Sequence, residues 1–222
     1  MIVKMTFMKF LLPLLLFISS AVHADDWSLA RDSSNIKVWT RHIPDYPIRG
    51  FKAVTVVKSS LGGLLALIMD TERADQWIYR ITQVDVLKRD DEKASFVIRV
   101  VTDFPWPLSN RDVIVAGQIS QDEKTGAVVV SSRSLALPQY PPLDDFVRMP
   151  DIDGSWIFRP LANGLVEVTM QGRADPGGSI PAGIVNLIIH ETPYRTLQGL
   201  RRVIGDRRYQ DVSFPSIKEP QS

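Results

Sequence analysis

The chain has 222 residues, contains no cysteine, and carries 26 Lys and Arg side chains against 25 Asp and Glu side chains, a formal net charge of +1 at pH 7. Nucleic-acid-binding proteins normally carry a basic excess, so we expect no nucleic-acid partner. The lack of cysteine excludes disulfide bridges, thiol nucleophiles and a lipid-modified cysteine anchor. The length is sufficient for one domain with its own hydrophobic core.

The first 24 residues have the pattern of a secretory signal peptide. Lys4 and Lys9 precede an apolar run over residues 10–18, and Val22 and Ala24 are the small residues of a cleavage site. The run is about half of the roughly 20 residues that a membrane-spanning helix requires. We expect cleavage after Ala24 and export across the inner membrane. Because exported eukaryotic domains often carry disulfide bridges, the lack of cysteine favours a bacterial periplasm.

Alternation of apolar and polar residues predicts strands along most of the remaining chain. These strands are expected over residues 36–41, 51–56, 81–87, 94–102, 112–120, 127–135, 155–161 and 165–174. The leucine-rich stretch 61–69 predicts a helix, and Asp70 or Thr71 is suited to cap a second short helix that ends at Trp77. Residues 136–154 contain four prolines, so we expect a long ordered loop there.

The last predicted element is one long helix over residues 181–204, kinked at Pro193. Its first half is apolar on almost all sides, whereas the apolar residues of its second half form one stripe. A helix packed on a sheet needs only one stripe, so the first half must be covered on a second side or must itself cover something.

The pattern as a whole predicts an α+β domain over residues 25–208, in which a curved antiparallel sheet packs on the C-terminal helix. The polar, proline-containing residues 209–222 predict a flexible tail. The helix ends in a basic group (Arg201, Arg202, Arg207 and Arg208). Such a group either reflects the preference for cations at helix C-termini or provides docking to anionic head groups.

Several segments, in the right order, resemble the StAR-related lipid-transfer (START) domain family. They are residues 105–112 before a central strand, 140–142 with 147–148 and 154–156 before the penultimate strand, and 175–181 with Asn186 and 192–197 in the C-terminal helix; Trp77 matches as well. The resemblance covers residues 30–204. It implies a helix-grip fold, in which a curved antiparallel sheet is wrapped around the C-terminal helix with a hydrophobic tunnel between them.

The resemblance further implies a lipid-binding protein without catalytic residues, metal or cofactor. Its partners would be one lipid, such as a phospholipid, fatty acid or sterol-like molecule, and transiently a membrane, and we expect a monomer. Many family members transfer their lipid between membranes. Pro193 and the loop 136–154 are where a gate is expected.

The implied ligand-binding residues are mostly apolar: Leu65, Ile68, Trp106, Trp156, Met170, Ile184, Leu187, Ile188, His190, Glu191 and Tyr194. For the apolar ones the alternative is ordinary core packing, and for His190 and Glu191, the polar candidates for a head group, it is solvent exposure. Some mammalian members pair a buried acid with an arginine in the tunnel. This chain has Val100 and a residue near Gly117 at those positions, so the polar contacts of the ligand are left open.

Motifs for catalysis are incomplete. His190-Glu191 begins like a zinc-protease motif, but Tyr194 stands where the second His is required. Residues 177–181 end in Pro181 where a nucleophile elbow requires Gly. The alternative function is an enzyme of the same helix-grip superfamily, of polyketide cyclase type, acting on a hydrophobic ligand. Such an enzyme would need His190, Glu191 or Arg99 to face the cavity together. A domain whose cavity is filled by side chains is a third alternative.

Overall fold

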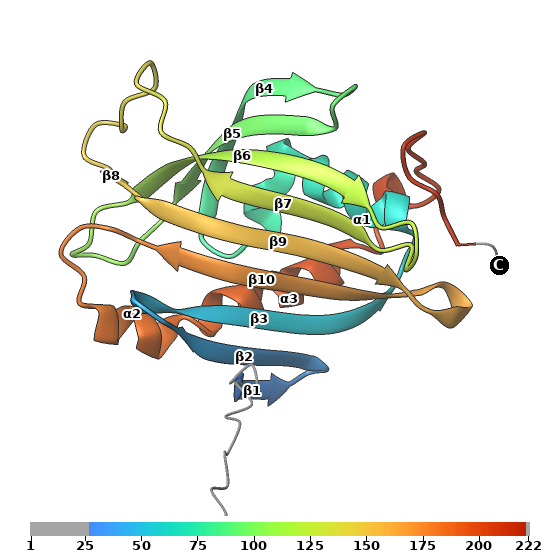
Figure 1. Cartoon of the computed structure of the whole chain (residues 1–222), viewed down its shortest axis with the longest axis horizontal. Coiled ribbons are helices and arrows are strands. Elements are labelled where there is room, and N and C mark those ends of the chain that lie inside the picture. The colour runs from blue at the N-terminus through green and yellow to red at the C-terminus, as the bar shows by residue number, and fades with distance from the viewer. Residues whose placement is uncertain (1–26, 221–222) are drawn as a thin grey trace, which may run out of the picture.

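The computed structural model describes residues 27–220, so the predicted signal peptide lies outside the described part of the chain. The strands are β1 (Ser28–Ser33), β2 (Ile36–Ile43), β3 (Tyr46–Lys58), β4 (Ile81–Asp90), β5 (Ser95–Thr102), β6 (Arg111–Gln121), β7 (Val128–Ser134), β8 (Val147–Arg148), β9 (Asp151–Pro160) and β10 (Leu165–Asp175). They form one curved sheet in the order β1-β2-β3-β10-β9-β7-β6-β5-β4, and β8 pairs in parallel with β6 (Figure 1).

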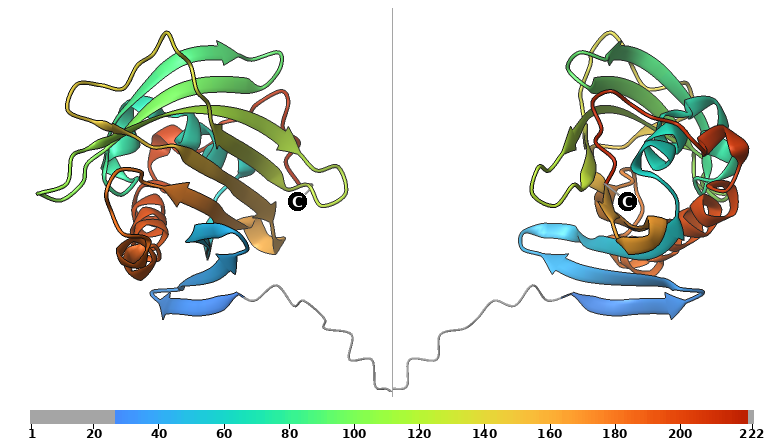
Figure 2. Two further views of the ribbon diagram at one scale, coloured as in Figure 1. Left: turned by 60° about the vertical axis from the view of Figure 1, so that its left-hand side comes forward. Right: turned by 90° about the vertical axis from the view of Figure 1, so that its right-hand side faces the viewer.

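The helices lie on one face of this sheet (Figures 1 and 2), which we call the inner face; the opposite face is the outer face. They are α1 (Leu61–Met69), α2 (Ala182–Ile188), α3 (Glu191–Val203) and the short 3-10 helices η1 (Thr71–Gln76) and η3 (Arg207–Tyr209); a further 3-10 turn, η2 (Ala162–Gly164), forms the connection between β9 and β10. Within residues 27–220 no helix is long and apolar enough to cross a membrane.

The predicted fold class is confirmed, because the predicted strands and the first helix are present and the antiparallel sheet carries the C-terminal helices on its inner face. The sequence pattern missed β1, whose residues are almost all exposed and therefore do not alternate. It also missed β8, and β9 begins at Asp151, inside the predicted loop.

The C-terminal helix is present, and the predicted kink at Pro193 takes the form of a short interruption. The helix is interrupted at Ile189 and His190, which separate α2 from α3. Pro193 explains the position of this break, because proline has no amide N–H for the carbonyl of Ile189 and its ring would collide with that carbonyl. Pro193 lies instead in the first turn of α3, where a missing N–H is tolerated.

The core lies between the inner face and helices α1 and α3. Leu61 and Leu64 of α1, Leu197 and Leu200 of α3, and Phe158 of β9 are fully buried in one cluster. The residue after η1 comes so close to α3 that a Cβ atom at Gly199 would lie 2.0 Å from the carbonyl oxygen of Trp77. Only glycine allows this approach.

Residues 207–220 lie along α1 and the end of β6. The carboxylate of Glu219 accepts hydrogen bonds from the amides of Leu61 (3.1 Å) and Gly62 (2.7 Å) at the start of α1, where a negative charge is favourable. The hydroxyl of Tyr209 donates to Asp70 (2.8 Å), and burial together with this bond raises the pKa of Tyr209 to about 12. The segment predicted to be a flexible tail thus contacts the helices of the inner face.

Candidate functional site

An apolar cavity of about 180 Å³ lies on the inner face, between the sheet and the α1–η1 segment. Its volume is similar to that of an engineered apolar cavity of roughly 150 Å³ that binds benzene. Within residues 27–220, the only polar residues that line it are Thr71, Arg89 and Ser132. Its apolar lining residues are Ile68, Met69, Ala74, Ile78, Ile81, Val84, Val86, Phe96, Ile98, Val100, Val115, Val130, Ile152 and Trp156.

The alternation of β5 explains how this lining arises. Phe96, Ile98 and Val100 face the cavity because side chains two residues apart share a face of a strand. The ring of Phe96 lies over β6, because the residue opposite is Gly117, where a Cβ atom would lie 2.1 Å from that ring. No charge occupies positions 100 and 117, so this part of the cavity is apolar.

Helix α2 lies at one end of the sheet and is attached by Asn186. The side chain of Asn186 accepts a hydrogen bond from the amide of Arg49 (2.8 Å) and donates one to the carbonyl of Pro47 (3.0 Å). Val185 is buried, whereas Ile184, Leu187 and Ile188 are 54%, 73% and 54% exposed. The latter three follow the i, i+3, i+4 spacing of one helix face, so α2 presents an apolar stripe to solvent.

A second exposed apolar group lies on the loop 103–110, at the same end of the molecule as α2 (Figures 1 and 2). Trp106 is 92% exposed there, and Leu108 is exposed as well. Buried Arg111 links this loop to the segment before α2, because it donates to the carbonyls of Ser109, Pro176 (3.1 Å) and Gly177 (3.4 Å). We call Trp106, Leu108, Ile184, Leu187 and Ile188 the apolar rim.

The loop between β7 and β8 is fastened on the other side of the sheet. Fully buried Asp112 follows the alternation of β6 onto the outer face and accepts two hydrogen bonds from Arg148, at 2.9 and 2.8 Å. The Nε atom of Arg99 lies 3.8 Å from the same carboxylate, and its Nη2 donates to the carbonyl of Pro141 (3.3 Å). Within the predicted gate loop 136–154, only Ile152 lines the cavity.

The structure brings two of the predicted ligand-binding residues, Ile68 and Trp156, to the cavity. Leu65 is buried in the packed core, and Met170 lies on the inner face opposite Trp156. Trp106, Ile184, Leu187 and Ile188 belong to the apolar rim, described above as exposed.

The predicted polar residues lie at the start of α3, near β1. Glu191 is held by Arg195 (2.7 Å) and Arg31 (2.6 Å), and the hydrogen bond from Arg195 is the main cause of its lowered pKa. Tyr194 is buried beneath the guanidinium of Arg31, which lies 3.5 Å from the ring centre. His190 lies at the break between α2 and α3, and Arg99 is on the outer face. The structure does not bring His190, Glu191 and Arg99 together.

Sequence reasoning missed most of the lining, including Phe96, Ile98 and Val115. Their signal was present, because all three alternate within strands that were predicted. The prediction placed the ligand against the C-terminal helix instead, because the first half of that helix is apolar on almost all sides.

Comparison with known proteins identifies relatives over most of the chain. The START domain family model matches residues 16–206. An uncharacterized protein of Pseudomonas aeruginosa is 31% identical over 185 residues, 83% of this chain and 89% of that protein. Phosphatidylcholine transfer protein of Rattus norvegicus is 24% identical over 169 residues, 75% of this chain and 78% of the relative.

The solved structures agree with the fold. The crystal structure of a STAR-related lipid transfer protein from Xanthomonas axonopodis has a TM-score of 0.73 and 33% identity, and covers 81% of this chain and 99% of that one. The resemblance and the helix-grip architecture predicted from the sequence are thereby confirmed.

Proposed function

The chain belongs to the START domain family, and from this premise we propose that it binds one lipid between its sheet and its helices, without catalysis. The observation that carries the proposal is the apolar cavity on the inner face, with its mainly aliphatic lining. Among the described lining residues, Arg89 is the one charged group, and its guanidinium is paired with Asp91 at 2.6 Å.

The gain from enclosing an acyl chain is large. Each buried methylene contributes about 0.8 kcal/mol, so a 16-carbon chain left in water would cost roughly 13 kcal/mol. A cavity of about 180 Å³ holds a body of benzene's size rather than such a chain, so loading requires the helices to move away from the sheet. Helix α2 is suited to move, because Asn186 and Val185 provide most of its attachment.

The apolar rim supports a transient membrane contact during loading. The loop 103–110 and α2, which carry its exposed aromatic and aliphatic side chains, lie at the same end of the sheet (Figure 2), and such groups insert into the interfacial layer of a bilayer. The basic end of α3 supports a structural role, because Arg202 donates to the carbonyl of Gln76 (2.6 Å) and Arg201 to that of Ser34.

We extend the proposal to the location of the protein. The signal-peptide pattern of residues 1–24 supports export to a bacterial periplasm, and a monomer is sufficient to form the cavity. The mass and N-terminal sequence of the protein recovered from a periplasmic fraction test cleavage after Ala24.

Two neighbouring residues of β5 provide the test of lipid binding. Ile98 faces the cavity and Val97 faces away from it. We expect the wild-type protein from its native host to yield about one lipid per chain on extraction and mass spectrometry. Ile98→Trp should fill the cavity and reduce this yield at least about tenfold, whereas Val97→Trp should leave it unchanged.

Thermal unfolding of both variants controls for misfolding. A wild-type protein that yields no lipid and ignores fluorescent fatty acids, sterols and phospholipids would refute the proposal. Equal lipid yields from Ile98→Trp and wild-type would place the ligand elsewhere.

A further inference from the structure

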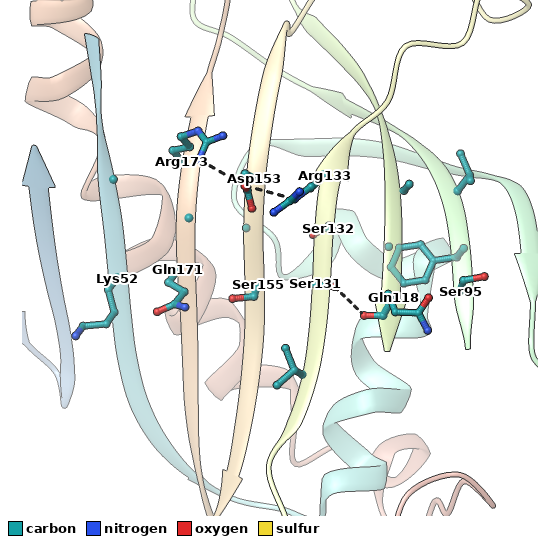
Figure 3. Close-up of a pocket in the computed structure, with 18 of the residues that line it drawn as sticks. Lys52, Ser95, Gln118, Ser131, Ser132, Arg133, Asp153, Ser155, Gln171 and Arg173 are labelled. Carbon is teal, nitrogen blue, oxygen red and sulfur yellow. Dashed lines mark hydrogen bonds and ion pairs between the residues drawn. The ribbon is translucent and has the colours of Figure 1, made fainter. Parts of the chain in front are cut away.

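The outer face of the sheet is hollowed into a trough of about 1070 Å³, which we call the outer trough (Figure 3). A row of polar side chains forms its floor and crosses six adjacent strands: Lys52, Gln171, Ser155, Ser131, Gln118 and Ser95. Each residue of this row is paired directly opposite the next one. Strands lie about 4.8 Å apart, so the row is about 24 Å long.

A polar outer face is ordinary for a sheet that is covered on one side only. The shape of this one is not, because the short side chains of Ser155 and Ser131 occupy the middle of the row and the longer Gln171 and Gln118 flank them on either side. The side chains of Ser155 and Gln171 make no hydrogen bond to another residue within 27–220, so their polar groups are available to a ligand.

Positive charge is concentrated in the outer trough. Six cationic residues line it against two acidic ones, Asp90 and Asp153, an excess of four charges where the whole chain has +1. Asp153 lies 3.5 Å from Arg133 and 3.4 Å from Arg173, which also donates a hydrogen bond to Asp151 at 2.8 Å, so these carboxylates hold two guanidinium groups beside the floor (Figure 3). This excess favours an anionic ligand.

An aromatic ring marks one end of the outer trough. Trp27 lines it there, with the guanidinium of Arg41 at 4.7 Å and the ammonium of Lys52 at 5.0 Å from the ring centre. The site therefore offers an apolar ring face, cations, and a row of hydroxyl and carboxamide groups that donate and accept hydrogen bonds.

We propose that the outer trough binds an acidic polysaccharide, a chain of sugar units that carry carboxylates. The sugar hydroxyls match the Ser and Gln side chains of the floor, the carboxylates match the cations, and a sugar ring can lie against Trp27. A flat bilayer cannot reach the floor of a concave surface. Single-stranded nucleic acid would require aromatic rings along its length, and an acidic peptide lacks the hydroxyl groups that the floor matches.

The test uses the full chain and polygalacturonate, with calorimetric titration at low ionic strength. We expect binding that weakens at 0.5 M salt because screening shortens to about 4 Å, and no binding of neutral dextran. Lys52→Gln combined with Arg133→Gln should weaken binding about tenfold. Val97→Trp, which places a bulky side chain in the outer trough without changing the charge, should also weaken it.

Two matched variants serve as controls. Arg159→Gln removes a cation from the same strand as Asp153, but outside the outer trough, where Arg159 pairs with Glu167. Ile98→Trp alters the cavity on the inner face. Both should bind polygalacturonate within twofold of wild-type, and all variants are checked by thermal unfolding.

Three outcomes would overturn the proposal: no binding of polygalacturonate by the wild-type protein, an equal loss of affinity in Arg159→Gln, or tighter binding of poly-glutamate or single-stranded DNA with the same dependence on Val97→Trp. The last would assign the outer trough to another class of partner. Because Ile98→Trp and Val97→Trp act on opposite faces, failure of this proposal is distinguishable from failure of lipid binding.

Discussion

The two faces of the sheet are built by alternate residues of the same strands, yet they have opposite chemistry. On β5, Ile98 and Val100 line the apolar cavity, whereas Ser95 and Val97 line the outer trough. The helices cover the inner face, and the outer face is covered mainly where the loop after β7 folds over Asp112. Whether a polar side chain of this sheet must be paired with another residue therefore depends on what lies over it, a helix, a loop or solvent, and not on which strand carries it.

Asp112→Ala should lower the free energy of unfolding more than any of the other substitutions. A small effect would contradict the view that a covered polar group on the outer face must be paired. Asp112 is fully buried on the polar face and neutralises Arg148, so its removal leaves that partly buried guanidinium without its carboxylate partner. We expect a loss of about 3–5 kcal/mol in the free energy of unfolding, measured with urea. Asp153→Ala, which breaks more exposed pairs on the same face, should cost less than about 1 kcal/mol.

Gly199→Ala tests how tightly the inner face is packed. The added methyl group would meet the carbonyl oxygen of Trp77, a backbone atom that cannot rotate away. We expect a loss of about 2–3 kcal/mol in calorimetric unfolding. Gly183→Ala in α2 is the matched control, because no atom lies within 4 Å of the new methyl group, and it should be neutral or slightly stabilising.

Trp106→Ser combined with Leu187→Ser tests the apolar rim, where apolar side chains are exposed rather than covered. We expect the binding to phospholipid vesicles to fall about tenfold in flotation assays. The free energy of unfolding should change by less than about 0.5 kcal/mol, because both side chains are largely exposed. Leu29→Ser removes an exposed leucine on β1, away from the rim, and should retain vesicle binding.

The smallest effect concerns the pH dependence of the contact between Tyr209 and Asp70. Burial raises the pKa of Tyr209 to about 12 from its ordinary value near 10, so folding favours the protonated hydroxyl. This contribution is complete below pH 10 and is lost as the pH rises to 12. Tyr209→Phe should remove this part of the dependence in urea titrations between pH 9 and 12. An unchanged slope would contradict the assignment to Tyr209.

The sequence by itself determined α1, the α+β class and every strand except β1 and β8, because the alternation of apolar residues and the turn signals are local properties of the chain. The helix-grip fold was implied by the resemblance of its motifs to the START family. It also determined that Pro193 disturbs the C-terminal helix. The break lies at Ile189 and His190, because the clash concerns the carbonyl four residues earlier.

Only the tertiary structure decided which apolar residues surround a cavity and which remain exposed. The apolar composition of Ile184, Leu187 and Ile188 is the same in a covered helix and in an exposed one. Their exposure follows from how Asn186 attaches α2 to the amide of Arg49, 137 residues away in the chain. Likewise, Phe96 reaches over the inner face because distant pairing sets Gly117 opposite it. Contacts between segments so far apart depend on the packing of the whole domain, which no local pattern encodes.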